Sequence, residues 1–180
     1  MIGHVPWLEK PSSGMLEAFD VAVFTKDVRA LPTLSKLIEG EEESLQRAAA
    51  IAFDRLSEAA PLEVMTQLNA NPALMAERPF VRADYFSKAD LSQAAQRHAV
   101  EQYLSRGDVS LPEKGKFLKA SAAPTTFISD NLLTTPAPPP DDTARRQALS
   151  AATADWMKTG RFPELQPEIT QLHRRLTGGR

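Results

Sequence analysis

The stretch from Ala30 to Ala60 limits what this chain can fold into more than any other, because its apolar residues recur with helical spacing. Spacings of three and four place residues on one face of a helix. These residues are Leu31, Leu34, Leu37 and Ile38 in the first half, and Leu45, Ala48, Ala49, Ala52, Phe53, Leu56 and Ala59 in the second. Gly40 is expected to end the first helix in the left-handed conformation that glycine adopts without strain. The stretch therefore predicts two antiparallel helices, with the acidic run 41–43 at the positive start of the second.

Helical spacing also recurs along the rest of the chain, and no run of residues alternates in the way of a half-buried strand. Valine and isoleucine are scarce while alanine and leucine are abundant, which favours helices over strands. The sequence therefore predicts an all-α fold. Further helices are expected at 13–25, 61–68, 73–77, between Asp90 and Gly107, from Pro112 onward, at 143–158 and at 163–176. The first of these should bury Met15, Leu16, Phe19, Ala22 and Val23.

Proline clusters divide the chain into parts. Pro6 and Pro11 break any helix near the start, because proline lacks an N–H group and restricts the residue before it. Several prolines between 124 and 140 favour an extended polyproline conformation. The expected parts are an N-terminal arm (1–13), a helical repeat domain (14–122), a proline-rich linker (123–142) and a C-terminal helical hairpin packed on the domain (143–180).

Two motifs mark the helix pair: LPTLSKLI in its first helix and LQRAAAIAFDRL in its second. In this pattern of aliphatic residues, basic residues and an alanine-rich run, the pair resembles a HEAT repeat. Such alanines let two helix backbones approach to about 8 Å. The pattern departs from the family at Gln46, where arginine is common, and in the turn before it, where glutamate replaces aspartate. The resemblance implies a short right-handed α-solenoid of helical hairpins.

Weaker echoes of the second helix follow later in the chain. Its buried positions correspond to Ala95, Ala99, Val100 and Tyr103, which lie 47 residues on, and then to Ala148, Ala152 and Trp156, 53 residues further. These intervals are unequal and longer than one repeat of the family, so regular repetition does not follow from them. An irregular helical bundle is therefore the alternative architecture.

Composition bounds the location and the class of partner. Lys and Arg number 21 against 23 Asp and Glu, giving a formal charge of −2, whereas nucleic-acid-binding proteins usually carry a basic excess. The absence of cysteine excludes disulfides and thiolate chemistry and is consistent with a reducing compartment. No secretory signal begins the chain, and no apolar run approaches the roughly 20 residues of a membrane span. We therefore expect a cytoplasmic protein with no membrane contact.

The residues that usually carry chemistry do not assemble into a motif. His98 and Glu101 lie one helical turn apart, but a zinc site needs three or four converging ligands. No Gly-x-Ser-x-Gly elbow and no phosphate-binding glycine loop is present. We therefore predict no catalytic residue, metal or cofactor, and a binding protein rather than an enzyme.

Arginines gather in the C-terminal third, around a tryptophan. The candidate binding residues are Arg145, Arg146, Trp156, Arg174 and Arg175. Basic groups with an aromatic ring can hold nucleic acid, and Asp155 beside Trp156 resembles the acidic and aromatic residues of HEAT-like DNA glycosylases. Trp156 also falls on an apolar stripe with Leu149 and Ala152, where a core role explains it.

The leading hypothesis is a non-catalytic scaffold or adaptor of α-solenoid type that binds another protein. It is motivated by the repeat-like helix pair and by a proline-rich linker that could let the last helices close over a partner. The alternative is a HEAT-like DNA-binding or DNA-repair protein on the same scaffold. A third hypothesis is a structural subunit whose apolar ends stack on copies of itself.

Overall fold

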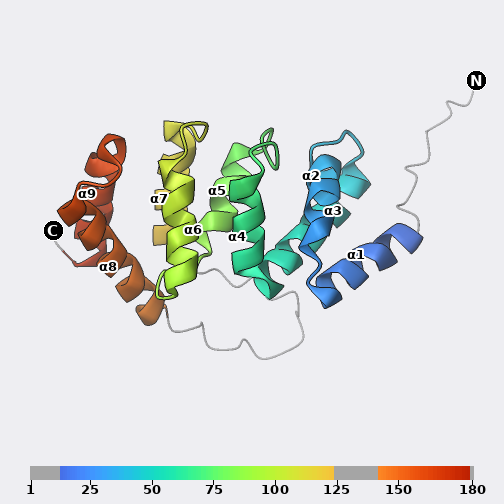
Figure 1. Ribbon diagram of the computed structural model, residues 1–180, viewed down its shortest axis with the longest axis horizontal. Helices are drawn as coiled ribbons and strands as arrows, with labels where there is room; N and C mark the ends of the chain where they lie inside the picture. The colour runs from blue at the N-terminus through green and yellow to red at the C-terminus, as the bar shows by residue number, and fades with distance from the viewer. Residues whose placement is uncertain (1–12, 124–141, 179–180) are drawn as a thin grey trace, which may run out of the picture. The chain divides into compact units, whose positions relative to one another are not determined.

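The computed structural model describes residues 13–123 and 142–178, and their regular structure is entirely helical (Figure 1). The prediction of an all-α fold is confirmed for these residues. The predicted arm, apart from Ser13, and most of the predicted linker lie outside them. None of the helices in these two ranges combines the length and apolar character that crossing a membrane requires.

Contacts between backbone segments divide the chain into two compact units, Met1–Tyr85 and Phe86–Arg180. The division falls within helix α5 (Pro79–Ser87), inside the helical domain predicted for 14–122. The sequence around it carries no proline or glycine between Phe80 and Arg106, so composition gave no sign of a boundary there.

The first unit is built around the helix pair that the sequence predicts. Its elements are α1 (Ser13–Thr25), the short 3₁₀ helix η1 (Val28–Ala30), α2 (Leu31–Ile38), α3 (Glu43–Ala59), α4 (Pro61–Ala70) and the first part of α5. Helix α2 packs on α3, which also contacts α1 and α4. Most of the predicted inward residues form the core, among them Leu31, Leu34, Ala49, Ala52, Phe53 and Leu56. The others are only partly buried: Leu37, Leu45, Ala48 and Ala59. The alanine-rich stripe is therefore the buried face of α3.

The prediction for Gly40 is wrong in its conformation. Helix α2 ends at Ile38, and the chain leaves it through Glu39 with φ −84° and ψ −10°, while positive φ among the described glycines occurs at Gly160 and Gly178. A Cβ atom on Gly40 would lie 3.3 Å from the Leu37 carbonyl oxygen. Glycine at this position therefore relieves crowding in the turn rather than supplying a left-handed residue.

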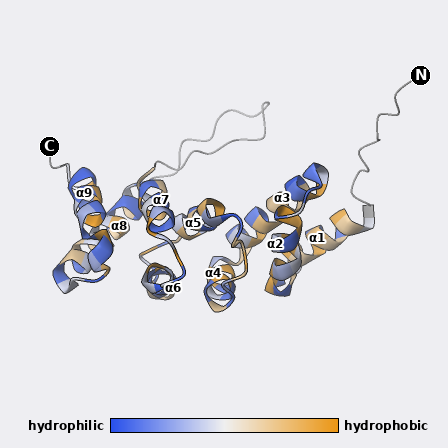
Figure 2. Cartoon of the chain, turned by 90° about the horizontal axis from the view of Figure 1, so that it is seen from above, coloured by the Kyte–Doolittle hydropathy of each residue, from blue (hydrophilic) through white to orange (hydrophobic). Residues whose placement is uncertain are grey.

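The buried face predicted for α1 is only partly correct. Phe19 is buried, but Leu16 is 40% exposed, and Phe24, on the far side of the helix, is 89% exposed. Figure 2 shows orange, hydrophobic segments along α1. Because α1 packs chiefly on α3, that contact covers a narrow stripe and leaves Leu16 at its edge.

The second unit holds the end of α5 followed by α6 (Ala94–Ser105), α7 (Leu111–Ala122), α8 (Thr143–Thr159), η2 (Pro163–Leu165) and α9 (Gln166–Leu176). Helices α8 and α9 form a hairpin, and α9 also packs on α7. Gly160 closes α8 with φ 63°, which confirms the predicted helix end. In the core, the Phe86 and Tyr103 rings stack with centroids 4.1 Å apart.

Turns replace predicted helical residues at two places. Helix α6 begins at Ala94 rather than after Asp90, because the Asp90 carboxylate accepts hydrogen bonds from the Ser92 N–H and hydroxyl at 3.0 and 2.6 Å. As a result Ala95, an expected echo of the buried stripe, is exposed. Residues 73–77 form turns instead of a helix, with Met75 at φ 59° and its N–H bonded to the Ser35 hydroxyl oxygen at 2.9 Å.

Candidate functional site

The candidate binding residues all belong to α8 and α9 of the second unit, but the structure does not bring them to one place. Trp156 is buried, Arg145 is partly buried beneath neighbouring helix ends, and three arginines are exposed: Arg146, Arg174 and Arg175. Each of these groups has a different environment.

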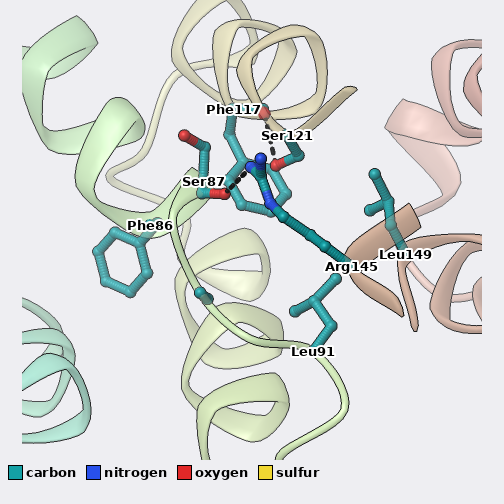
Figure 3. A pocket seen from close by; sticks show the side chains of 8 residues that line it. Phe86, Ser87, Leu91, Phe117, Ser121, Arg145 and Leu149 are labelled. Carbon is teal, nitrogen blue, oxygen red and sulfur yellow. Dashed lines mark hydrogen bonds between the residues drawn. The ribbon is translucent and has the colours of Figure 1, made fainter. Parts of the chain in front are cut away.

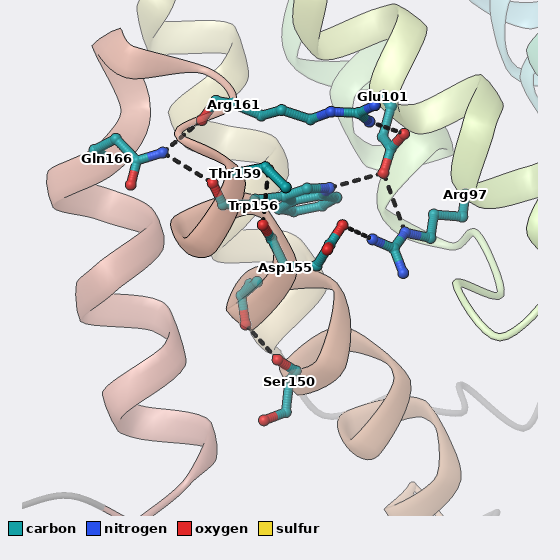
Figure 4. A network of polar contacts seen from close by, with 9 residues as sticks. Arg97, Glu101, Ser150, Asp155, Trp156, Thr159, Arg161 and Gln166 are labelled. Carbon is teal, nitrogen blue, oxygen red and sulfur yellow. Dashed lines mark hydrogen bonds and ion pairs between the residues drawn. The ribbon is translucent and has the colours of Figure 1, made fainter.

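Trp156 is a fully buried core residue. Its ring meets the Phe162 ring edge-on at 5.6 Å, and its indole N–H donates a hydrogen bond to a Glu101 carboxylate oxygen at 2.9 Å (Figure 4). A buried tryptophan needs such a partner for its N–H group. Trp156 therefore fastens α8 to α6, and in this structure its faces are covered and do not present a stacking surface.

Glu101 is the centre of a polar network that joins α6 to the α8–α9 hairpin (Figure 4). Besides Trp156, its carboxylate pairs with Arg97 at 3.1 Å and with the guanidinium of Arg161. Arg97 also reaches Asp155 on α8 at 2.5 Å. The side chain of Glu101 is only 14% exposed, so these charges are partly withdrawn from water.

Two opposing effects set the pKa of Glu101. Burial raises the pKa because it disfavours the charged carboxylate, while hydrogen bonds from Trp156 and Arg97 and the nearby charge of Arg161 lower it. The donors prevail, and the pKa lies below the ordinary value of 4.5. The carboxylate is consequently ionised at neutral pH. Sequence reasoning paired Glu101 with His98, but the spacing that mattered was Arg97 to Glu101, one turn apart.

Arg145 caps two helix ends. Its guanidinium donates to the carbonyl oxygen of Ser87 at 2.9 Å, at the end of α5 (Figure 3). It also donates to the carbonyl oxygen of Ala123 at 3.5 Å, at the end of α7. Cations are favoured there because unpaired carbonyls give a helix end partial negative charge. The adjoining cavity, which Phe86, Phe117 and Leu149 help to line, has a volume of about 10 Å³. Arg145 is thus engaged in holding helices together.

Arg146, the next residue, belongs to an open groove between α8 and α9 with a volume of about 640 Å³. The groove is lined by Thr143, Arg146, Gln147, Ser150, Ala151, Ala154, His173 and Leu176. It contains two basic side chains and no carboxylate among these eight residues. His173 Nδ1 lies 3.0 Å from the hydroxyl oxygen of buried Thr153, which fixes the imidazole at the groove wall. Arg174 and Arg175 are exposed on α9 but do not line the groove.

A groove of similar volume, about 630 Å³, lies between α2 and α3 of the first unit. Its lining includes Glu41 and Glu42 from the turn between these helices, together with Lys36. Acidic side chains therefore border this groove, whereas basic side chains border the groove between α8 and α9.

The comparisons with known proteins identify no relative. No family model matches the chain, and neither a curated protein nor a solved structure shows significant similarity to it. Within residues 13–123 and 142–178, no three histidine or carboxylate side chains lie where they could hold a metal ion. The resemblance to HEAT repeats stays a prediction.

Proposed function

We propose that this chain is a non-catalytic scaffold of α-solenoid type that binds a partner protein, and that the α8–α9 groove docks a segment of that partner. The observation that carries the proposal is the groove itself. It is open, it is bordered by two helices, and it offers small, polar, basic and apolar side chains in one place.

The helices that border the groove are fastened to their neighbours. Trp156 and Arg97 tie α8 to α6, and Lys114 of α7 pairs with Glu164 of η2 at 3.1 Å, next to the start of α9. The Lys114 side chain is only 6% exposed. A surface that is already ordered loses little conformational entropy on binding, which favours affinity.

A protein partner fits the available charges better than nucleic acid. Arg97 and Arg161 face carboxylates, and Arg145 faces helix carbonyls. Of the exposed arginines of the hairpin, Arg146 lines the groove, whereas Arg174 and Arg175 do not. A nucleic-acid surface gains most of its non-specific affinity from several cations that contact phosphates. The cytoplasmic location stays a prediction.

Site-specific photo-cross-linking tests the proposal. A photoreactive amino acid is placed at Ala151, which is exposed in the groove, and in a control at Gln67, which is exposed on α4 of the first unit. In the native cell, the Ala151 variant should capture one protein in high yield, and the Gln67 variant should not. Arg146→Glu should reduce the capture.

The controls separate docking from incidental contact. Arg175→Glu makes the same change of charge on the same hairpin away from the groove, so it should leave the yield unchanged. Capture of nucleic acid instead of protein, or equal capture from Ala151 and Gln67, would contradict the proposed function.

A further inference from the structure

We infer, on the basis of the proposed function, that the segment which the α8–α9 groove accepts is an acidic helix of about three turns. The juxtaposition behind this inference is a strip of small side chains on α8 that lies between two basic ones, Arg146 and His173.

The charge of the groove favours a partner segment of negative charge. Arg146 and His173 line it, while Asp155 and Glu164 pair with Arg97 and Lys114 on other helices. The other described carboxylates of the hairpin, Asp142 and Glu168, do not line the groove. Carboxylates of a partner would therefore meet Arg146 and His173 and no carboxylate of the lining. A basic partner segment would bring its positive charge next to Arg146, and this repulsion would disfavour its binding.

The shape of the groove selects a helix. Ser150, Ala151 and Ala154 form a floor of small side chains, and small side chains let a helix axis approach to about 8 Å. The lining runs along α8 from Thr143 to Ala154, a length of about 16 Å at about 1.5 Å per residue. This length matches about three helical turns. Leu176 adds an apolar contact for such a helix, which is the usual way that a helix binds in a groove.

Two other occupants fit less well. A nucleic acid would find one arginine and one histidine in the lining and a floor that is partly apolar, and contact with several phosphates requires more positive charge. A second copy of the chain could offer its acidic run 41–43, but only the second and third of these glutamates lie close to or within a helix, α3. The favoured occupant is therefore a separate protein with a longer acidic helix.

A displayed library of helical peptides, randomised at exposed positions, tests the inference on the full chain. Peptides are selected on the wild type and counter-selected on Ala151→Trp, which fills the groove from an exposed position. Groove-dependent peptides should carry net negative charge, with Asp or Glu three or four residues apart. Their affinity should fall about tenfold or more with Arg146→Glu and change less than about twofold with Arg175→Glu.

The outcomes distinguish this inference from the proposed function. Groove-dependent peptides that are neutral or basic would overturn the acidic helix, while a protein captured at Ala151 would leave docking in place. Enrichment of no groove-dependent peptide would also overturn the inference. If a duplex DNA probe bound more tightly than the peptides and its binding depended on Arg146, nucleic acid would replace the proposed protein partner. If Ala151 cross-linked to a second copy of the chain, that copy would replace it. Failure of the Ala151 capture would remove the proposed function itself.

Discussion

The two units use their charged side chains differently. In the first unit, the ion pairs Arg29–Asp27, Arg47–Glu43 and Arg55–Asp20 lie on the surface, and each contains a side chain at least 74% exposed. In the second unit, Glu101 is 14% exposed and Lys114 is 6% exposed, and both join different helices. The first unit packs α2 on α3 through apolar side chains and also buries Arg82, whose guanidinium donates to the Pro72 carbonyl oxygen at 3.2 Å. The second unit has a polar network that fastens its hairpin.

This difference bears on binding. In the second unit Arg97, Arg145 and Arg161 are engaged in packing, and the groove has Arg146 and His173 as its basic lining. In the first unit the glutamates of the α2–α3 turn border the other groove. A cluster of charges in the sequence therefore does not by itself mark a binding surface, because some of the charged side chains can form ion pairs and hydrogen bonds within the folded chain.

The largest effect is expected in the apolar packing of the first unit. Ala52 is 4% exposed on α3, so Ala52→Arg should bury an unpaired charge and lower the free energy of unfolding by about 3–5 kcal/mol. Ile51→Arg is the matched control, because the neighbouring Ile51 is 55% exposed, and it should change stability by less than about 0.5 kcal/mol. Hydrogen exchange of first-unit peptides measures both. Equal effects of the two substitutions would show that the buried face of α3 is wrongly assigned.

A smaller effect is expected in the network of the second unit. Trp156→Phe removes the N–H donor to Glu101 and should cost about 1–3 kcal/mol, since the bond has a charged acceptor. A double-mutant cycle with Glu101→Ala, which removes the acceptor, separates the bond from the loss of ring volume. The cycle should give a coupling energy of about 1 kcal/mol in chemical unfolding. Strictly additive effects would mean that the polar contact contributes nothing beyond packing.

Local periodicity was enough to predict much of the fold. In residues 30–60 the spacing of Leu31, Phe53 and Leu56 gave the buried face, because a helix places such residues on one side whatever surrounds it. The same reasoning placed Trp156 on the apolar stripe of α8. Pro61 and Gly160 marked a helix start and a helix end through their own backbone preferences.

The site depended on contacts that spacing does not encode. Trp156 meets Glu101 from 55 positions away, and Arg145 meets Ser87 from 58. The sequence contains the arginines but not the carbonyls or carboxylates that they face after folding. For this reason the predicted binding cluster separated into a core residue, a helix cap, an exposed groove residue and two exposed arginines outside the groove. The later helix start after Asp90 has a local cause, because the Asp90 carboxylate accepts a hydrogen bond from the Ser92 N–H and so favours a turn over the helix.

The polar network should also make the second unit sensitive to acid. The pKa of Glu101 is lower in the folded chain than the ordinary value of 4.5, so its contribution to stability is present above about that pH. The contribution is lost as the pH falls through the lowered pKa, because protonation then removes the acceptor charge. Unfolding of a Trp7→Phe variant, followed by Trp156 fluorescence from pH 7 to pH 3, should show this loss, and Glu101→Gln should make the decline shallower. An unchanged pH profile in the variant would exclude Glu101 as the source.

The smallest effect is expected for a surface ion pair of the first unit. Arg47 and Glu43 lie one turn apart on α3 with side chains 77% and 68% exposed, and solvent and salt screen their attraction. Arg47→Ala should therefore change the free energy of unfolding by less than about 0.5 kcal/mol, a change that disappears in 1 M salt. Hydrogen exchange of first-unit peptides measures the stability of Arg47→Ala and of Glu43→Ala, which removes the other member of the ion pair. A loss above about 1 kcal/mol would mean that surface charge supports this unit as well, and the contrast with the Glu101 network would then be one of degree.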